Sequence, residues 1–305
     1  MYDVIARKLA NGEVVILDGG TGTELQRQGV AMDSEVWCAM SNLTHADAVR
    51  AVHTAYINAG AEVITANTYA SSPLSFTHLG REDDIEPIDR AAVRLAREAI
   101  QDAASSPVSV AGSCSVMPPV ARGGYRSPER QWDPDRIRSL YQRKVDVLAD
   151  AGCDLIIMEM MRDLDVSLWA TEAAVATGLP VWVGMSVERD DEGDLVSFAN
   201  QKWGLATLAE ALMATGAHAA LVMHNEISTT GESLALIRSV WNGPLGAYPE
   251  AGHFEMPTWV FRDISPGEFA EAAMRWRGGG AYILGGCCGI TPEHIGALAN
   301  AVAGR

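Results

Sequence analysis

Two adjacent cysteines, Cys287 and Cys288, are the residues whose types and spacing say most about chemistry. They follow two glycines, and such a turn lets the backbone approach a ligand closely. Thiolates are soft ligands that suit Zn²⁺, so the pair could supply half of a tetrahedral site. A zinc-bound thiol loses its proton near neutral pH and becomes a nucleophile, which would suit alkyl transfer to sulfur. The alternative interpretation is that both cysteines are small buried hydrophobes.

The other three cysteines, Cys38, Cys114 and Cys153, are scattered along the 305 residues. An odd number of widely spaced cysteines in a large chain does not predict a disulfide framework, and free thiols are typical of a reducing cytoplasm. Residues 1–13 read as a short polar helix without the apolar core of a signal peptide. No run of about 18 apolar residues occurs, so no membrane span is predicted. We therefore expect a cytoplasmic protein.

The charge balance limits the classes of partner. The chain has 23 Lys and Arg against 39 Asp and Glu, which gives a net charge of −16. Nucleic acids and anionic membranes are bound by basic surfaces, so neither is expected as a partner. The acidity weakly favours cationic ligands. The hydrophobic share of 48% excludes disorder as a description of the whole chain, because it supplies enough apolar surface for a core.

Short apolar runs recur along the chain and are typical of buried parallel strands, because they are apolar throughout and do not alternate. Eight such runs occur: Glu13–Asp18, Ala61–Asn67, Pro107–Ser113, Asp154–Glu159, Pro180–Val187, Ala217–Met223, Pro244–Tyr248 and Ala281–Gly285. Amphipathic helical patterns lie between them, among them Ala46–Ala59, Glu86–Ser105 and Asp135–Ala151. Eight alternating units predict an α/β fold of the (β/α)8 TIM-barrel class, with one domain over residues 1–305.

A doubly wound open sheet is the alternative fold. Such a sheet typically carries a G-x-G-x-x-G turn after its first strand, and the turn here, DGGTGTEL, lacks that spacing.

Two polar segments of the chain are interpreted separately from the strands and helices. Pro118–Asp135 is rich in Pro, Gly and Arg and is expected to form a long loop that could act as a lid. Asp190–Asp194 is interpreted as a solvated turn in preference to a metal-binding loop.

Polar side chains gather at the carboxyl ends of the predicted strands, where barrel enzymes carry their reactive groups. For Asn67, Ser113 and Ser186, capping of a strand end is an equal alternative. The candidates are Asp18, Gly19, Gly20, Asn67, Thr68, Ser113, Cys114, Glu159, Ser186, His224, Asn225, Glu226, Tyr248, Pro249 and Glu250, together with Gly286, Cys287 and Cys288.

Several motifs along the whole chain resemble the homocysteine S-methyltransferases, a family with S-methylmethionine-, betaine- and cobalamin-dependent members. LDGGTGTEL at Leu17–Leu25 resembles the family's opening strand and turn, and AGAEVITANTY is similar to its second-strand motif. DSEVWCAM resembles the S-methylmethionine branch more than the betaine branch. GGCCGITPEHI at Gly285–Ile295 resembles the C-terminal signature, which is highly specific.

The resemblance implies a zinc ion held by three cysteines, of which Cys287 and Cys288 match two. The first zinc cysteine of the family is replaced by Glu226, and the family's Tyr-Pro-Asn becomes Tyr-Pro-Glu with Glu250 at its end. A retained site with Glu226 as third ligand is favoured, because a carboxylate also binds zinc and keeps the formal charge. Cys114 or His224 could supply that ligand instead, and His224 shares a strand face with Glu226 if the strand continues.

Loss of the metal is the alternative interpretation of the replacements at Glu226 and Glu250. Glu226 would then be an acid/base or cation-binding group, and Cys287 or Cys288 at most a thiol nucleophile.

For the substrate, the resemblance suggests that Asp18 and Glu159 anchor the amino group of homocysteine, since an ammonium needs a carboxylate partner. Trp37 could pack against a methyl-sulfonium or ammonium group, with ordinary core packing as the alternative.

The expected function is transfer of a methyl group from S-methylmethionine, a betaine-like compound or S-adenosylmethionine to a zinc-activated thiol. Homocysteine would be the acceptor and methionine the product. The binding site is expected to comprise Asp18, Gly19, Gly20, Trp37, Asn67, Ser113, Glu159, Asn225, Tyr248 and Glu250. The alternatives are a diverged lyase, hydrolase or binding protein for a small cationic metabolite, and an inactive oligomer partner. Assembly into a homo-oligomer is left open.

Overall fold

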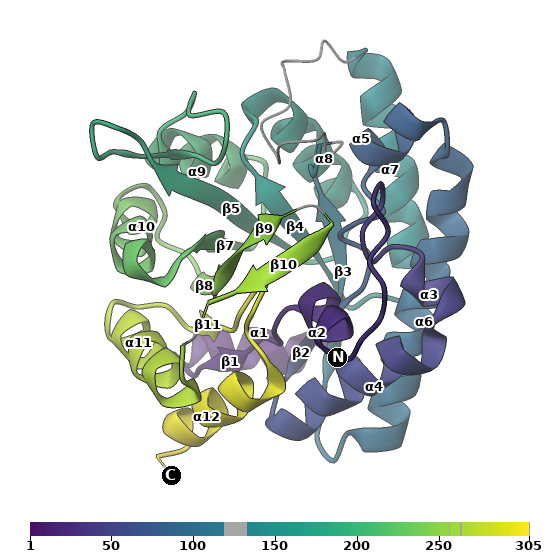
Figure 1. The fold of residues 1–305 in the computed structure, drawn as a ribbon. Helices are drawn as coiled ribbons and strands as arrows, with labels where there is room; N and C mark the ends of the chain where they lie inside the picture. Colours follow the sequence, from purple (N-terminus) through teal and green to yellow (C-terminus); the bar gives the residue numbers. More distant parts are fainter. Residues whose placement is uncertain (119–132, 256, 263, 305) are drawn as a thin grey trace.

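Eight parallel strands form a barrel in the computed structural model, which describes residues 1–118, 133–255, 257–262 and 264–304 (Figure 1). The strands follow one another in the order β1-β11-β8-β7-β5-β4-β3-β2. Their bounds are β1 Val15–Ile16, β2 Val63–Ala66, β3 Ser109–Ser115, β4 Leu155–Met161, β5 Val181–Arg189, β7 Ala219–Glu226, β8 Leu245–Glu250 and β11 Ile283–Leu284. The predicted barrel is confirmed.

The barrel closes between its first two strands. Leu17 and Val63 form a parallel bridge, and the Asp18 amide donates to the carbonyl of Val63 at 3.1 Å. The Glu62 amide donates in turn to the carbonyl of Ile16 at 2.8 Å. Closure leaves no open edge in this sheet and brings the carboxyl ends of the eight strands to one rim.

Helices surround the barrel and cover its outer face (Figure 1). Three of them confirm predicted helical patterns to within two residues at each end: α4 Ala46–Ala59, α6 Ile85–Ala103 and α7 Pro134–Asp150. The others are α2 Thr21–Arg27, α3 Ser41–Thr44, α5 Pro73–Leu79, α8 Leu164–Ala176, α9 Leu205–Met213, α10 Ile227–Val240, α11 Pro266–Gly278 and α12 Pro292–Val302, with a short 3₁₀ helix η1 at Glu82–Asp84. None of the helices in the described ranges has the length and apolar character that crossing a bilayer requires.

The barrel interior is apolar toward the amino ends of its strands, which we call its lower part. The N-terminal helix α1, Tyr2–Ala10, closes the barrel there. Ile5 belongs to the same buried cluster as Trp182 of β5 and Leu221 of β7. The indole Nε1 of Trp182 donates to the hydroxyl of Tyr2 at 3.1 Å. The amino ends of the strands therefore hold a packed plug, which leaves the carboxyl ends for polar groups.

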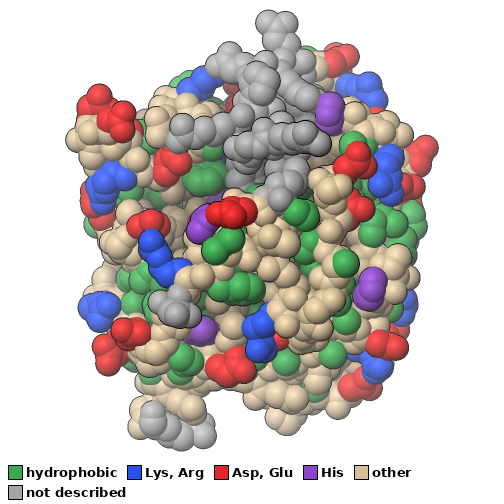
Figure 2. All heavy atoms as spheres, viewed as in Figure 1, with side chains coloured by type: hydrophobic (Ala, Val, Ile, Leu, Met, Phe, Trp, Pro, Cys, Tyr) green, Lys and Arg blue, Asp and Glu red, His purple; other side chains and the backbone are tan. Residues whose placement is uncertain are grey.

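Two short antiparallel elements were not predicted. Strand β6, Leu195–Ser197, pairs with the end of β5, and the acidic segment Asp190–Asp194 forms the exposed turn between them, as interpreted from the sequence. Strands β9, Gly252–Glu255, and β10, Thr258–Phe261, form a hairpin after β8 that crosses the mouth of the barrel (Figure 1). Most of the predicted lid loop, residues 119–132, lies outside the described residues (grey in Figure 1 and Figure 2).

A buried ion pair supports the loop after β2. Lys144 of α7 and Asp89 of α6 are both fully buried, with 2.7 Å between Nζ and Oδ2. The same ammonium donates to the carbonyls of Thr68 and Ser71, each at 3.1 Å, and to the Ser71 hydroxyl at 3.0 Å. All donors of the ammonium thus find partners, which offsets the cost of burying its charge.

This pair gives a test of stability. Replacing Lys144 by Met leaves the Asp89 carboxylate buried without its cation, and we expect the free energy of unfolding in urea to fall by about 3–5 kcal/mol. The matched control is Arg94→Met on α6, which removes an exposed pair with Glu98 and should leave stability nearly unchanged. Equal effects of the two substitutions would contradict this role.

Candidate active site and metal centre

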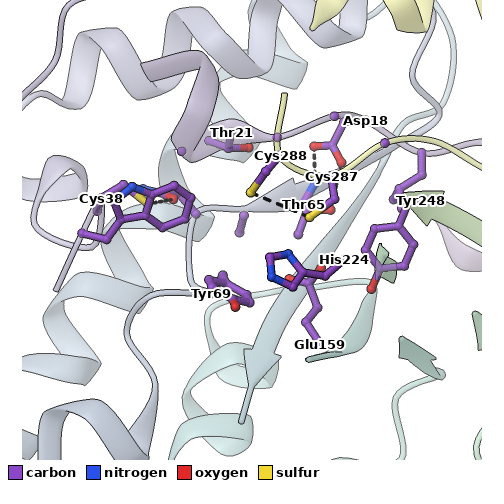
Figure 3. A pocket seen from close by; sticks show the side chains of 18 residues that line it. Asp18, Thr21, Cys38, Thr65, Tyr69, Glu159, His224, Tyr248, Cys287 and Cys288 are labelled. Atoms are coloured by element: carbon purple, nitrogen blue, oxygen red, sulfur yellow. Dashed lines mark hydrogen bonds between the residues drawn. The ribbon is translucent and has the colours of Figure 1, made fainter. Parts of the chain in front are cut away.

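A pocket opens at the carboxyl ends of the barrel strands (Figure 3). It brings together most of the residues predicted for the site, although they come from distant parts of the chain. Those that line it are Asp18, Gly19, Gly20, Trp37, Asn67, Glu159, Tyr248, Cys287 and Cys288. The lining also includes His224, Cys38, Thr65 and Tyr69, which were not among the residues expected to bind substrate.

Three of the lining residues could hold a metal ion. One ligand atom each of His224, Cys287 and Cys288 lies within 4.8 Å of the others, and the two cysteine sulfurs are 3.9 Å apart. Figure 3 shows the His224 ring and both sulfurs turned toward the same cavity. Two thiolates and an imidazole are a common protein donor set for zinc, with a fourth position left for a substrate. The residues present therefore fit this metal.

The third donor differs from the one favoured by the sequence. The Glu226 side chain is 63% exposed, and its carboxylate lies 3.8 Å from the guanidinium of Arg262 and accepts from the Ser228 hydroxyl. It points away from the cysteines, and His224 takes the place beside them instead. Cys114 is fully buried in the layer between the barrel and the helices.

An irregularity in β7 explains why His224, and not Glu226, lies beside the cysteines. The register with β8 shifts between Met223 and Glu226, and His224 has a left-handed backbone with φ of 48°. Regular alternation would send His224 outward with Val222 and Asn225 inward with Met223. The shift turns the His224 ring into the pocket.

The same shift takes Asn225 out of the expected binding site. Its side-chain amide donates to the hydroxyls of Thr229 and Thr230 at the start of α10, at 3.1 and 3.0 Å. It also donates to the carbonyl of Glu226 at 3.0 Å. The side chain therefore fixes the turn from β7 into α10 and does not line the pocket.

The cysteines and His224 affect one another's ionisation. The Cys288 thiol and the His224 ring lower the pKa of Cys287 to about 6, against the effect of burial. The pKa of Cys288 is raised well above its usual range, because its proton is shared with Cys287 and the site is buried. Burial by itself would lower the pKa of His224, but the charges of Glu250 and Cys287 raise it to about 10.

Two buried carboxylates face the same pocket. Asp18 accepts from the amide and the hydroxyl of Thr65, at 2.7 and 2.9 Å, and burial raises its pKa to about 7. Glu159 accepts from the Ser113 hydroxyl, and burial together with the charge of Cys287 raises its pKa to about 8. Buried carboxylates with raised pKa values of this kind are common at functional sites. Ser113 thus acts through Glu159 and does not line the pocket.

The remaining predicted residues shape the pocket. A side chain at Gly19 would meet the Ile290 carbonyl at 2.3 Å, and one at Gly20 would meet the Cys287 carbonyl at 2.8 Å, so both glycines allow close backbone packing. The Asn67 amide donates to the carbonyl of Cys38 at 3.2 Å and to the Asn42 side chain at 3.0 Å. Asn67 therefore ties the segment after α2 to the end of β2.

Aromatic side chains form another part of the site. Trp37 packs edge-to-face against Tyr69 and against Phe254 of the hairpin, with ring centroids 6.3 Å apart in each pair. The hairpin also brings Trp259 to 6.3 Å from the His224 ring. Trp37 was singled out from the sequence, whereas its partners Tyr69 and Phe254 were not.

Comparisons with known proteins show the family of this chain. The profile of the family described as Homocysteine S-methyltransferase matches residues 15–302. Homocysteine S-methyltransferase 4 of Zea mays is 27% identical, over 95% of this chain and 90% of its own. S-methylmethionine--homocysteine S-methyltransferase BHMT2 of Pongo abelii is 26% identical, over 98% of this chain and 81% of its own. The metallated homocysteine methyltransferase MmuM of Escherichia coli has the same fold, with a TM-score of 0.78 and 22% identity over 98% of this chain and 99% of its own.

The lowered pKa of Cys287 predicts its reactivity. In metal-free protein, we expect alkylation of Cys287 by iodoacetamide to accelerate as the pH rises through about 6 and to level off above it, because the thiolate is the nucleophile. Peptide mapping by mass spectrometry follows each thiol.

Cys38 and Cys153 are the internal controls for this experiment. Burial raises the pKa of both to about 12, so they should stay unmodified in the folded protein. His224→Ala should move the Cys287 profile to higher pH. A wild-type profile centred in the ordinary thiol range would contradict the interaction.

Proposed function

This chain belongs to the homocysteine S-methyltransferase family, and we propose that it transfers a methyl group from a sulfonium or quaternary ammonium donor to the thiol of homocysteine. The observation that carries the proposal is the joint placement of two kinds of group in one pocket. His224, Cys287 and Cys288 offer a metal site, and Asp18 and Glu159 offer two carboxylates beside it. The first set suits a thiol and the second suits an ammonium, and homocysteine carries both.

The proposed metal is zinc, held by His224, Cys287 and Cys288. The chemistry that such an ion supplies when bound is Lewis acidity, which holds an acceptor thiol as its thiolate near neutral pH. Two thiolates and a neutral imidazole match the charge of the ion.

Asp18 and Glu159 are proposed to bind the ammonium group of the acceptor. Both carboxylates are buried, and burial alone disfavours their charged forms. An ammonium placed between them would restore the ionised state and form charge-assisted hydrogen bonds. Thr65 and Ser113 hold the two carboxylates in place from the second and third strands.

The methyl donor is proposed to lie against Trp37 and Tyr69, whose aromatic faces attract a sulfonium or ammonium cation. In the reaction, the acceptor sulfur attacks the methyl carbon. A new carbon–sulfur bond forms as the bond from methyl to the donor atom breaks, and the bonding pair remains on that donor atom. The chain's contribution is to hold the two reactants in line and to exclude water.

A second function is favoured by one observation. The donor set differs from the three cysteines that the family resemblance implies, because Glu226 replaces one of them and points to solvent. A member changed in this way could bind a small cationic metabolite, or act on it as a lyase or hydrolase, without methylating a thiol.

One assay separates the two functions. Zinc-loaded protein is incubated with homocysteine and S-methylmethionine, betaine or S-adenosylmethionine, and methionine is measured by mass spectrometry. We expect methionine with at least one donor, close to one zinc per chain, and loss of both on Cys287→Ser. Zinc-loaded protein that binds a donor by calorimetry but forms no methionine with any of them would contradict methyl transfer.

The proposed ammonium site predicts the effect of Glu159→Gln. This change keeps the size of the side chain but removes its charge, so kcat/KM for homocysteine should fall by about 10- to 100-fold, as expected for a lost charged hydrogen bond. Glu172→Gln, on the exposed side of α8, is the control and should leave kcat/KM unchanged. A Glu159→Gln enzyme with unaltered kcat/KM would place the ammonium elsewhere.

A further inference from the structure

His224 has a second close partner besides the cysteines. Its Nδ1 atom lies 2.5 Å from Oε2 of Glu250, the last residue of β8. The His224 side chain is 4% exposed and that of Glu250 13% exposed, so water competes little for this contact. Glu250 was expected from the sequence to bind substrate, but it does not line the pocket.

The contact decides which ring nitrogen faces the cysteines. An imidazole has two nitrogens, and Nδ1 lies within ion-pair distance of the Glu250 carboxylate. Nε2 is the nitrogen left for Cys287, which is also a hydrogen-bond partner of the ring. A neutral imidazole that donates from Nδ1 to a carboxylate presents the lone pair of Nε2, which is the form that binds a metal.

Neighbouring rings fix the plane of the imidazole. Phe198 packs edge-to-face on it with centroids 4.9 Å apart, and Trp259 of the hairpin lies at 6.3 Å. These apolar contacts hold the ring but do not distinguish one nitrogen from the other. The choice between the two flipped orientations is therefore left to the carboxylate of Glu250.

We propose that Glu250 is a positioning residue that orients His224 as the third ligand of a two-cysteine, one-histidine metal site in this chain. The inference rests on the metal site of the proposed function and deepens it. A carboxylate behind a ligating histidine raises the basicity of the ring and strengthens its bond to the metal. It also adds one negative charge next to a site whose two thiolates already balance a divalent ion.

The test measures zinc affinity, independently of methyl transfer. Competition with a chromophoric chelator gives the Kd for zinc of the full-length protein. We expect Glu250→Gln to weaken zinc binding by about 10- to 100-fold, since mutation of a carboxylate behind a ligating histidine has effects of this size. The control is Glu255→Gln, which changes another His–Glu pair. Its carboxylate lies 3.0 Å from Nε2 of His253, both side chains are exposed on the hairpin, and the Kd should stay unchanged.

A double-mutant cycle separates positioning from a general effect of charge. In a His224→Ala background, Glu250→Gln should no longer change the Kd, because its action passes through the ring. The visible spectrum of the cobalt-substituted protein should change with either single substitution, while circular dichroism confirms that each variant is folded.

Two outcomes would overturn the inference: a Glu250→Gln protein that binds zinc as wild type does, or an equal loss in the His224→Ala background. Failure of the proposed function looks different. Zinc binding would then depend on Glu250 and His224 as described, but no methionine would form with any donor. Methyl transfer that survives Glu250→Gln with unchanged zinc affinity would contradict this inference but not the proposed function.

Discussion

The candidate site depends on one irregularity of the backbone, the left-handed turn at His224 in β7. Regular strands alternate their side chains, and Leu221 and Met223 accordingly point into the barrel. The positive φ at His224 breaks this order and turns its ring into the pocket beside the cysteines. Such a backbone is costly for a residue other than glycine, and strained residues of this kind cluster at functional sites. Contacts with Glu250 and Phe198 offset the cost.

The barrel separates two environments along its axis. Its lower part is filled by apolar side chains and closed by α1, which gives the strands their stability. Its upper part buries the carboxylates of Asp18 and Glu159, and burial raises both pKa values. The folded chain thus carries an electrostatic cost in the pocket that a cationic ligand would relieve.

The hairpin connects segments that are far apart in the sequence. The backbone of Trp259 in β10 exchanges two hydrogen bonds with the Gln26 side chain of α2, at 2.9 and 2.7 Å. Its indole donates to the carbonyl of Ala251 at 3.1 Å. Helix α2, which follows β1, and the segment that follows β8 are thereby held together. Trp259 of the hairpin and the cluster of His224, Cys287 and Cys288 are therefore parts of one packed unit.

The sequence by itself determined the barrel, because eight apolar runs separated by amphipathic helices have few other ways to bury their surfaces. It also identified Cys287, Cys288, Asp18 and Glu159 as members of one site, since the carboxyl ends of parallel strands meet at a single rim. Only the tertiary structure decided that His224, and not Glu226, lies beside the cysteines. The periodic pattern of a strand predicts regular alternation. A shift of register arises from pairing with a neighbouring strand, and residues along the chain do not encode it locally.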